Sequence, residues 1–319
     1  MIFAQMRTPE LEAAYLRTSR RGRLAERVEK SLALLKSCTL CPRACRVNRL
    51  EGELGTCRAG RLPEVSSYSP HFGEEGPLVG SHGSGTIFLT HCNLRCSFCQ
   101  NYSISHLGEG REVSFDRLGR MMLELQDLGC HNINFVTPTH YVPQILAALP
   151  KAIELGLRMP LVYNSSGYDS VTTLQLLDGV FDIYMPDFKF ARPAPAAQYC
   201  RADDYPAVAR MAIKEMHRQV GDLICDEDGI ARRGLLIRHL VLPEGLAGTD
   251  DVVRFLAGEV SPRTYTNIMD QYFPCGDVPA HSPLGRRITG EEYAEALASA
   301  RAAGLVRLDD RKRCRRVIY

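Results

Sequence analysis

Residues 85–99 read GTIFLTHCNLRCSFC. The first six residues are an apolar run of the length and composition expected for a buried strand. Three cysteines with the spacing C-x3-C-x2-C follow directly, and no fourth cysteine lies close behind them. A structural zinc site and an electron-transfer [4Fe–4S] centre each use four protein ligands. Cys92, Cys96 and Cys99 therefore predict a [4Fe–4S] cluster in which one iron has no protein ligand.

An iron without a protein ligand can chelate the amino and carboxylate groups of a small molecule. S-adenosylmethionine (SAM) carries both groups, and its sulfonium would then lie close to the cluster. One electron from the cluster cleaves the S–C5′ bond and gives methionine and a 5′-deoxyadenosyl radical. A structural zinc ion or a disulfide is the alternative interpretation of the three cysteines.

From residue 85 onward, short apolar runs alternate with longer segments of helical periodicity. This alternation predicts an α/β fold with a parallel sheet, either a barrel or an open doubly wound sheet. The predicted strands are 85–90, 132–136, 160–164, 181–185, 235–242 and 267–272, and the predicted helices are 114–129, 142–155, 170–178, 204–220 and 249–258. A further helix is expected after Thr289, where Thr-Gly-Glu-Glu has the pattern of a capping box.

Each predicted strand is followed by a polar tail. The carboxyl ends of parallel strands meet at one end of the fold and carry its reactive groups. We therefore expect the tails to lie together, although each of them could be an ordinary turn. They are found at residues 90–92, 137–140, 165–167, 187–189, 243–244 and 273–275.

The charge and the cysteine content narrow the class of protein. Lys and Arg number 39 and Asp and Glu 37, and the resulting net charge of +2 does not favour a nucleic-acid partner. There is no secretory signal, and no apolar run approaches the ~18 residues of a spanning helix. We expect a soluble, cytoplasmic protein that does not associate with membranes. Outside two tight groups, the cysteines are expected to be free thiols: Cys130, Cys200, Cys225, Cys275 and Cys314.

The second tight group of cysteines precedes the first and has four members: Cys38, Cys41, Cys45 and Cys57. Four thiols are the number for a closed site, so we expect either zinc or a second [4Fe–4S] cluster. A pair of disulfides is the third option. Arginines interleave the four ligands and would offset the charge of the thiolates.

The loop with Phe98 before its third cysteine resembles the signature of the radical SAM superfamily. The segments NINFVTPTHY, YNSSGYDS, DIYMPDFKF and IRHLVLPEG are similar to its pyruvate formate-lyase activating enzyme-related branch with an N-terminal cysteine-rich segment. The resemblance implies a partial (βα)6 TIM-type barrel. It implies five regions: an N-terminal helical segment (1–37), a cysteine-rich metal-binding module (38–60), a connecting loop (61–84), the barrel (85–288), and a C-terminal helix and tail (289–319).

The same resemblance implies which residues contact SAM. Phe98 would lie beside the adenine, and Asp187 and Lys189 would lie against the ribose and the carboxylate. Asn164 and Ser166 end the third predicted strand and are expected to face the same ligand.

Other residues are expected to contact the charged groups of SAM or the substrate. The activating enzymes hold the SAM ammonium with a Gly-Gly-Glu segment, but this chain has Thr137-Pro138-Thr139, whose hydroxyls and carbonyls would replace it. Arg238 lies inside an apolar strand and needs an anionic partner, which we expect to be SAM or the substrate. Residues expected at the substrate opening are His140, Tyr141, Gln271 and Tyr272.

The function implied by the resemblance is hydrogen abstraction by the 5′-deoxyadenosyl radical. An open barrel suits a protein substrate, such as a backbone glycine in a partner enzyme that becomes a glycyl radical. A small-molecule substrate, a non-catalytic iron–sulfur electron-transfer protein and an RNA-modifying enzyme are the alternatives. The expected partner is a one-electron reductant such as flavodoxin or ferredoxin.

Overall fold

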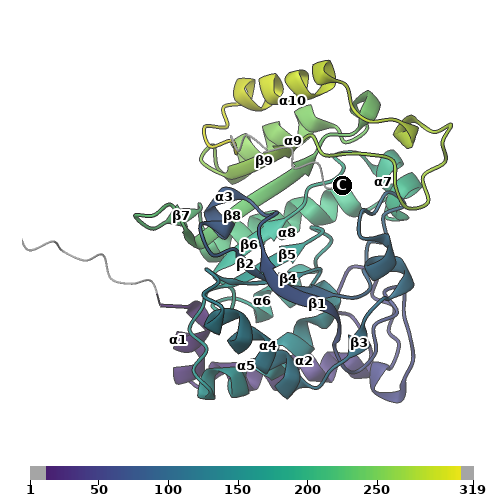
Figure 1. Ribbon diagram of the computed structural model, residues 1–319. Coiled ribbons are helices and arrows are strands. Elements are labelled where there is room, and N and C mark those ends of the chain that lie inside the picture. The colour runs from purple at the N-terminus through teal and green to yellow at the C-terminus, as the bar shows by residue number, and fades with distance from the viewer. Residues whose placement is uncertain (1–11, 310–319) are drawn as a thin grey trace, which may run out of the picture.

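In the computed structural model, which describes residues 12–309, one nine-stranded sheet forms the centre of the fold (Figure 1). The strands lie in the order β3-β1-β2-β4-β5-β6-β8, and β7 and β9 both pair with β8. Their bounds are β1 Glu64–His71, β2 Ser84–Leu89, β3 Arg111–Glu112, β4 Ile133–Val136, β5 Leu161–Ser165, β6 Ile183–Pro186, β7 Ile224–Cys225, β8 Ala231–Leu240 and β9 Tyr265–Met269.

Six of these strands run parallel in consecutive pairs: β2, β4, β5, β6, β8 and β9. They correspond to the six predicted strands, so the predicted α/β fold with a parallel sheet is confirmed. The sheet stays open because β1 and β3 extend one edge in antiparallel pairing while β9 pairs only with β8, as in a partial barrel.

Two predicted segments differ in detail from the structure. Residues 61–84, for which a connecting loop or a hairpin is expected, contain β1, which pairs antiparallel with β2, and the short helix α3 (Gly76–Val79). Strand β8 begins at Ala231, four residues before the predicted start. Residues 231–233 pair with β7, whereas the rest of β8 pairs in parallel with β6 and β9.

Successive side chains of the parallel strands point to opposite faces of the sheet. Ile183 and Met185 pack with Val162, whereas the intervening Tyr184 packs in the main core with the helices. Leu78 of α3 joins the first cluster, so α3 covers the face of the sheet opposite the main helical core.

The helices follow the predicted positions with ends displaced by a few residues. Figure 1 shows α9 and α10 beside β9, while α1, α2, α4 and α5 gather at the other edge of the molecule. The predicted capping box of the last helix is present, with the Thr289 hydroxyl and the Glu292 side chain bonded reciprocally. The bounds are α1 Ala14–Arg20, α2 Arg23–Ala33, α4 Phe115–Asp127, α5 Val142–Glu154, α6 Val171–Leu176, α7 Pro193–Cys200, α8 Tyr205–Val220, α9 Thr249–Phe255 and α10 Gly290–Ala302.

Asp182 attaches the first helix to the sheet. Its buried carboxylate accepts hydrogen bonds from the backbone N–H groups of Ala14 (2.8 Å) and Leu161 (3.0 Å). Burial raises the pKa of Asp182 to about 7, although these two bonds act to lower it.

We expect the D182A variant to lose about 2–4 kcal/mol of unfolding free energy, because two buried N–H groups lose their acceptor at about 1–3 kcal/mol each. The folded state binds the Asp182 proton more tightly than the unfolded state does. The stabilisation from Asp182 should therefore fall as pH rises from about 4 to about 7. Urea unfolding of both proteins at pH 5 and pH 8 measures this effect. A wild-type advantage that is larger at pH 8 would contradict the assigned direction.

Candidate functional site

The three-cysteine loop leaves the carboxyl end of β2 through a sharply turned backbone. His91 (φ 65°) and Arg95 (φ 54°) adopt left-handed conformations, which are uncommon for residues other than glycine. Backbone bonds fix the turn, from His91 N–H to the Ile104 carbonyl (3.0 Å) and from Ser97 N–H to the Tyr199 carbonyl (2.8 Å). Backbone contacts with residues 104 and 199 thus fix the loop, and Cys92, Cys96 and Cys99 are free of disulfides.

Hydrogen-bond donors surround the thiols of this loop. The Leu94 N–H approaches Cys92 Sγ (3.4 Å), and the Ser105 hydroxyl donates to Cys99 Sγ (3.1 Å). Burial raises the pKa of Cys92 to about 12, so the free thiols hold their protons and would release them when a metal binds. Donors directed at sulfur stabilise thiolates, and the loop therefore fits the ligand set of a cluster.

Cys200, at the end of α7, lies next to this loop. Its fully buried Sγ is 3.3 Å from Cys96 Sγ, a distance at which the thiol donates a hydrogen bond to the neighbouring sulfur. Two sulfurs in such contact are not placed to bind two separate irons of one cluster. In this structure Cys200 is therefore a hydrogen-bond donor to Cys96.

The C200A variant is expected to retain iron and the cleavage of SAM. Loss of the S–H donor should lower the reduction potential of the cluster, because hydrogen bonds to cluster sulfurs favour the reduced state. A redox titration followed by electron paramagnetic resonance (EPR) measures the shift, with the buried but distant Cys130 replaced by alanine as the control. Loss of the cluster in C200A alone would instead identify Cys200 as a ligand.

Backbone hydrogen bonds bring the predicted strand tails together. Thr137 N–H donates to the Asn164 carbonyl (2.8 Å), Asp187 N–H to the Ser165 carbonyl (2.9 Å), and Phe188 N–H to the Arg238 carbonyl (2.8 Å). The tails of β4, β5, β6 and β8 thus lie side by side at one end of the sheet, as expected for a parallel fold.

Asp187 and Lys189 face the same direction and form an ion pair (Nζ–Oδ2 2.5 Å). Burial alone would lower the pKa of Lys189, but the negative charge of Asp187 holds that pKa well above its ordinary value, and the Cys96 sulfur lies nearby. The pair therefore lies beside the three-cysteine loop, where its charges can meet a ligand.

Arg238 has the anionic partners that its position in an apolar strand requires, but they come from the chain itself. Its guanidinium bonds both carboxylates of Glu74 and Glu75, and Glu75 also accepts from Asn267 Nδ2 (2.7 Å). Both glutamates are buried and precede α3. A direct contact of Arg238 with SAM or substrate is therefore replaced in this structure by a bridge from the β1–α3 segment to β8.

In the segment after β4, Thr137 and Thr139 differ in backbone conformation and in side-chain contacts. Thr137 has φ 61°, which is strained for a β-branched residue and is the kind of backbone outlier found at functional sites. Thr139 instead donates its buried hydroxyl to Asp169 (2.7 Å), which also accepts from Tyr163 (2.9 Å) and Ser165 (2.6 Å). Thr139 therefore supports the turn after β4.

Two sets of buried polar atoms fit a polar ligand at this end of the fold. Both side-chain atoms of Asn134 and the hydroxyl of Ser166 are buried without a hydrogen-bond partner among residues 12–309. Asn134 alternates with Ile133 and Phe135 of the main core, so it points to the opposite face of the sheet. Buried polar atoms normally have partners, so this face suits a molecule that supplies them.

Phe98 packs inside a group of aromatic rings. Its ring is edge-on to Phe190 (centroids 5.8 Å apart), Tyr199 (6.5 Å) and Tyr272 (6.2 Å). Tyr272 is buried and donates to the Leu284 carbonyl (2.6 Å), while Gln271 is exposed. These contacts hold the loop in place and leave Gln271 as the more accessible of the two predicted substrate residues after β9.

His140 and Tyr141 do not line an opening in the structure. Both are buried, the His140 ring bonds the Thr90 carbonyl (2.9 Å), and its carbonyl accepts from Arg49 (2.7 Å). Burial lowers the pKa of His140 to about 3, so it is neutral at physiological pH. The turn Thr139–Tyr141 directs these side chains under the N-terminal segment, which favours a structural role for both.

The N-terminal cysteines lie in a loop with the same pattern of donors as the first site. Backbone N–H groups two residues downstream donate to the sulfurs, from Arg43 to Cys41 and from Ala59 to Cys57. Ala44, Arg46 and Arg58 have positive φ, as in tight turns that wrap a ligand. All four thiols are free, and Cys45 is the most accessible of them.

Arg49 is a buried cation beside the N-terminal cysteines. It is 1% exposed, its five-donor head bonds only the carbonyls of Gly60 and His140, and no carboxylate pairs with it in the part of the chain described. A buried cation needs a compensating anion, and the Cys57 sulfur lies near it, although burial raises the pKa of that thiol. A metal–thiolate centre would supply that charge.

Neither cysteine group is arranged around a single point. Within residues 12–309, no three His, Cys, Asp or Glu side chains converge as ligands of one metal ion.

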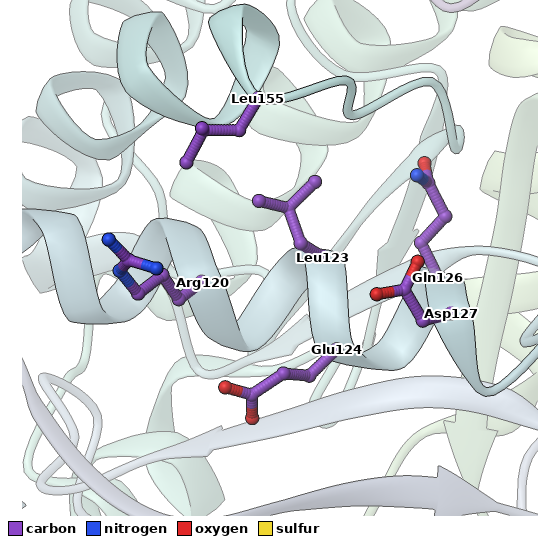
Figure 2. Close-up of a pocket in the computed structure, with 6 residues that line it drawn as sticks. All are labelled: Arg120, Leu123, Glu124, Gln126, Asp127 and Leu155. Carbon is purple, nitrogen blue, oxygen red and sulfur yellow. The ribbon is translucent and has the colours of Figure 1, made fainter.

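A shallow hollow elsewhere on the surface does not involve these residues. Figure 2 shows it on the outer side of α4, with Leu155 facing it from the end of α5. Its lining residues are Arg120, Leu123, Glu124, Gln126, Asp127 and Leu155. None of the predicted site residues lies there.

A partial parallel barrel with three cysteines on the loop after its first parallel strand defines a class of iron–sulfur α/β proteins. The sequence model of the Radical SAM superfamily matches residues 86–219. The chain belongs to the radical SAM superfamily, and this membership implies a [4Fe–4S] cluster and SAM as cofactors.

Two known proteins extend this comparison. The chain is 33% identical over 286 residues to the uncharacterized protein MJ0674 of Methanocaldococcus jannaschii, covering 86% of this chain and 77% of the relative. A solved radical SAM methyltransferase from Sphaerobacter thermophilus matches with a TM-score of 0.47 and 14% identity, over 70% of this chain and 65% of that chain. Across residues 12–309, no helix has the length and hydropathy needed to span a bilayer.

Four residues at the site were not predicted from the sequence: Glu74, Glu75, Asn93 and Cys200. The adjacent acids Glu74 and Glu75 in an otherwise uncharged Gly- and Pro-rich segment were a usable signal for a buried ion pair. Asn93 and Cys200 carried no such signal, because their roles depend on contacts with distant parts of the chain.

Proposed function

We propose that this chain holds a [4Fe–4S] cluster through Cys92, Cys96 and Cys99, binds SAM at the remaining iron, and cleaves it reductively to a 5′-deoxyadenosyl radical that abstracts a hydrogen atom. The observation that carries the proposal is the ligand count. One loop presents three thiols, and two further thiols lie beside it: Cys200 is engaged with Cys96, and Cys275 donates to the Phe98 carbonyl.

The remaining residues would bind and orient SAM. The Asp187–Lys189 pair offers a carboxylate for ribose hydroxyls and an ammonium for the SAM carboxylate. The strained backbone at Thr137 and the ends of β5 at Asn164 and Ser166 offer carbonyl and hydroxyl groups for the SAM ammonium. Arg238 would act indirectly, by holding the β1–α3 segment against β8.

We propose a protein substrate, with a small molecule as the alternative. The sheet is open at one side, which suits a substrate loop entering beside the cluster. Activation of a glycyl radical in a partner enzyme is the specific form of this proposal. The one-electron reductant would be a flavodoxin or ferredoxin type of protein, and the second metal at the N-terminal cysteines would be zinc or iron–sulfur.

The test is reductive cleavage of SAM by anaerobically reconstituted protein with dithionite. We expect the wild type and the control C130A to release 5′-deoxyadenosine and methionine in a one-to-one ratio. C92A, C96A and C99A should release neither product. Iron content should fall by about four per chain in those three variants. Wild-type protein with a reducible cluster but no 5′-deoxyadenosine would identify an electron carrier. A lone zinc ion bound by the three-cysteine loop would contradict both the radical SAM enzyme and the electron carrier.

A further inference from the structure

The hydroxyl of Tyr205 joins the polar tails of β5 and β6. Tyr205 is the first residue of α8, and its side chain is fully buried. The hydroxyl accepts a hydrogen bond from Lys189 N–H (2.8 Å) and lies within donating distance of the carbonyls of Ser166 (2.9 Å) and Asp187 (3.1 Å). One side chain from a helix therefore bonds the backbone of both residues of the Asp187–Lys189 ion pair.

A phenol meets both requirements of this position. The Lys189 N–H needs an acceptor and the two carbonyls need a donor, and a hydroxyl offers both. Burial raises the pKa of Tyr205 well above its ordinary value, so the hydroxyl keeps the hydrogen that it donates. Without the hydroxyl these backbone groups would lose a partner, and the segment from Asp187 to Lys189 would shift to find another.

Gly167 allows the two tails to approach closely. Its φ is +75°, and a Cβ atom placed there would lie 2.3 Å from the Asp187 carbonyl oxygen and 3.3 Å from the Tyr205 hydroxyl. Only glycine fits both this conformation and this space. The tail of β5 thus lies directly against Asp187 and the Tyr205 hydroxyl, with no side chain of Gly167 between them.

The ring of Tyr205 is held on several sides. It stacks on Tyr168 (centroids 6.1 Å apart, interplanar angle 27°) and contacts Phe188 and Phe190, each with centroids 6.4 Å away. Tyr168 is itself fixed, because its hydroxyl donates to Asp204 Oδ1 (2.7 Å). The Tyr205 hydroxyl therefore has a defined position. Phenylalanine in its place would keep the ring contacts and remove only the contacts of the hydroxyl.

We propose that Tyr205 is a positioning residue for SAM. Its hydroxyl holds the backbone from Asp187 to Lys189 against the tail of β5, so that the carboxylate and the ammonium of the ion pair face the cofactor together. The inference rests on the proposed function, in which this pair binds SAM. Tyr205 acts through Asp187 and Lys189, because its own hydroxyl is already bonded to their backbone.

The experiment compares Y205F with Y184F in full-length protein reconstituted anaerobically with iron and sulfide. Tyr184 of β6 is equally buried, but its hydroxyl donates to Gln219 Oε1 (2.6 Å) in the main helical core. Titration of SAM into the dithionite-reduced protein, followed by EPR, gives the dissociation constant. We expect this constant to rise about tenfold in Y205F, the equivalent of about one buried hydrogen bond, and to stay unchanged in Y184F.

Further measurements separate positioning from general damage. The iron content and the midpoint potential of Y205F should equal those of the wild type, since the Tyr205 hydroxyl bonds none of the three cysteines. In the cleavage of SAM, KM should rise about tenfold while kcat falls less than about threefold, as for a loss of binding. Y184F should lose as much unfolding free energy in urea as Y205F does, and yet keep the wild-type KM.

Gly167 provides a second and independent variant. G167A would push the Asp187 carbonyl away from the tail of β5 and should weaken the binding of SAM as Y205F does. G156A is its control, because Gly156 also has a positive φ (+104°) but no atom lies within 4 Å of its added Cβ. If Y205F loses its iron, this pair decides the matter by the same titration.

A dissociation constant for SAM that is equal in Y205F and the wild type would overturn the proposal, as would an equal rise in Y184F. Equal constants for G167A and G156A would do the same. In these cases, release of 5′-deoxyadenosine by the wild type would show that the proposed function holds and that only the role of Tyr205 fails. Wild-type protein that binds no SAM would overturn both.

Discussion

The R238M variant is expected to lose about 3–5 kcal/mol of unfolding free energy, the usual effect of removing one partner from a buried ion pair. Arg238 compensates both Glu74 and Glu75, which are 5% and 2% exposed. Burial alone would raise the pKa of Glu75, but the charge and hydrogen bonds of Arg238 hold it below its ordinary value. Methionine fills a similar volume, so the loss would come from charge and not from a cavity.

Two controls separate this explanation from a general loss of packing. R232M removes an arginine from the same strand whose partner, Asp226, is partly exposed, and it should cost only about 0–1 kcal/mol. Adding E74Q and E75Q to R238M should recover part of the loss, because the two buried charges are then absent. Urea unfolding measures all three proteins. The R238M deficit should also shrink below pH 5, as the Glu75 carboxylate takes up a proton without its arginine, and a deficit independent of pH would contradict the argument.

The sequence was most informative about local and periodic features. Alternating side chains predicted the parallel strands, and a cluster loop directly after the first of them was evident from C-x3-C-x2-C. The capping box at Thr289 involves residues only three apart, and the structure has it as expected. In each case the determining interactions lie within one element or between neighbouring elements.

The sequence was least informative about partners that meet across the fold. Arg238 clearly required an anion, but its glutamates are more than 160 residues away in the chain. The sequence predicted an isolated thiol at Cys200, but in the fold it contacts Cys96, which lies 104 residues earlier in the chain. The direction of turns was equally hidden, because a short helical turn decides that His140 points inward. Such contacts depend on the packing of whole elements, which spacing alone does not encode.

These distant contacts share a physical consequence. Glu74 and Glu75 bridge β1–α3 to β8 through buried charge, and the partly buried Arg43 bridges the N-terminal cysteines to the three-cysteine loop. An open barrel has no closing strand pair, so side chains across its ends must fix its shape. The segment before the barrel therefore takes part in forming the site and is not a passive extension.

Arg49 tests this view of the N-terminal segment. We expect R49M to lose about 3–5 kcal/mol of unfolding free energy in the metal-loaded protein, because the carbonyls of Gly60 and His140 lose their donor and the metal–thiolate centre loses its buried counter-charge. R49K keeps the positive charge but lacks the planar guanidinium that reaches both carbonyls. Its unfolding free energy should therefore lie between those of the wild type and R49M.

Removal of the N-terminal metal separates the two contributions of Arg49. With the centre chelated and its thiols protonated, Arg49 has no anion beside it, and only the hydrogen bonds to Gly60 and His140 still favour the arginine. The difference between wild type and R49M should therefore fall by at least half, measured by urea unfolding with and without a chelator. Met replaces the whole aliphatic stem, so loss of packing would give the same difference under both conditions. An undiminished difference in the metal-free protein would show that Arg49 stabilises the segment through its carbonyl contacts alone, and the N-terminal centre would then need another source of charge balance.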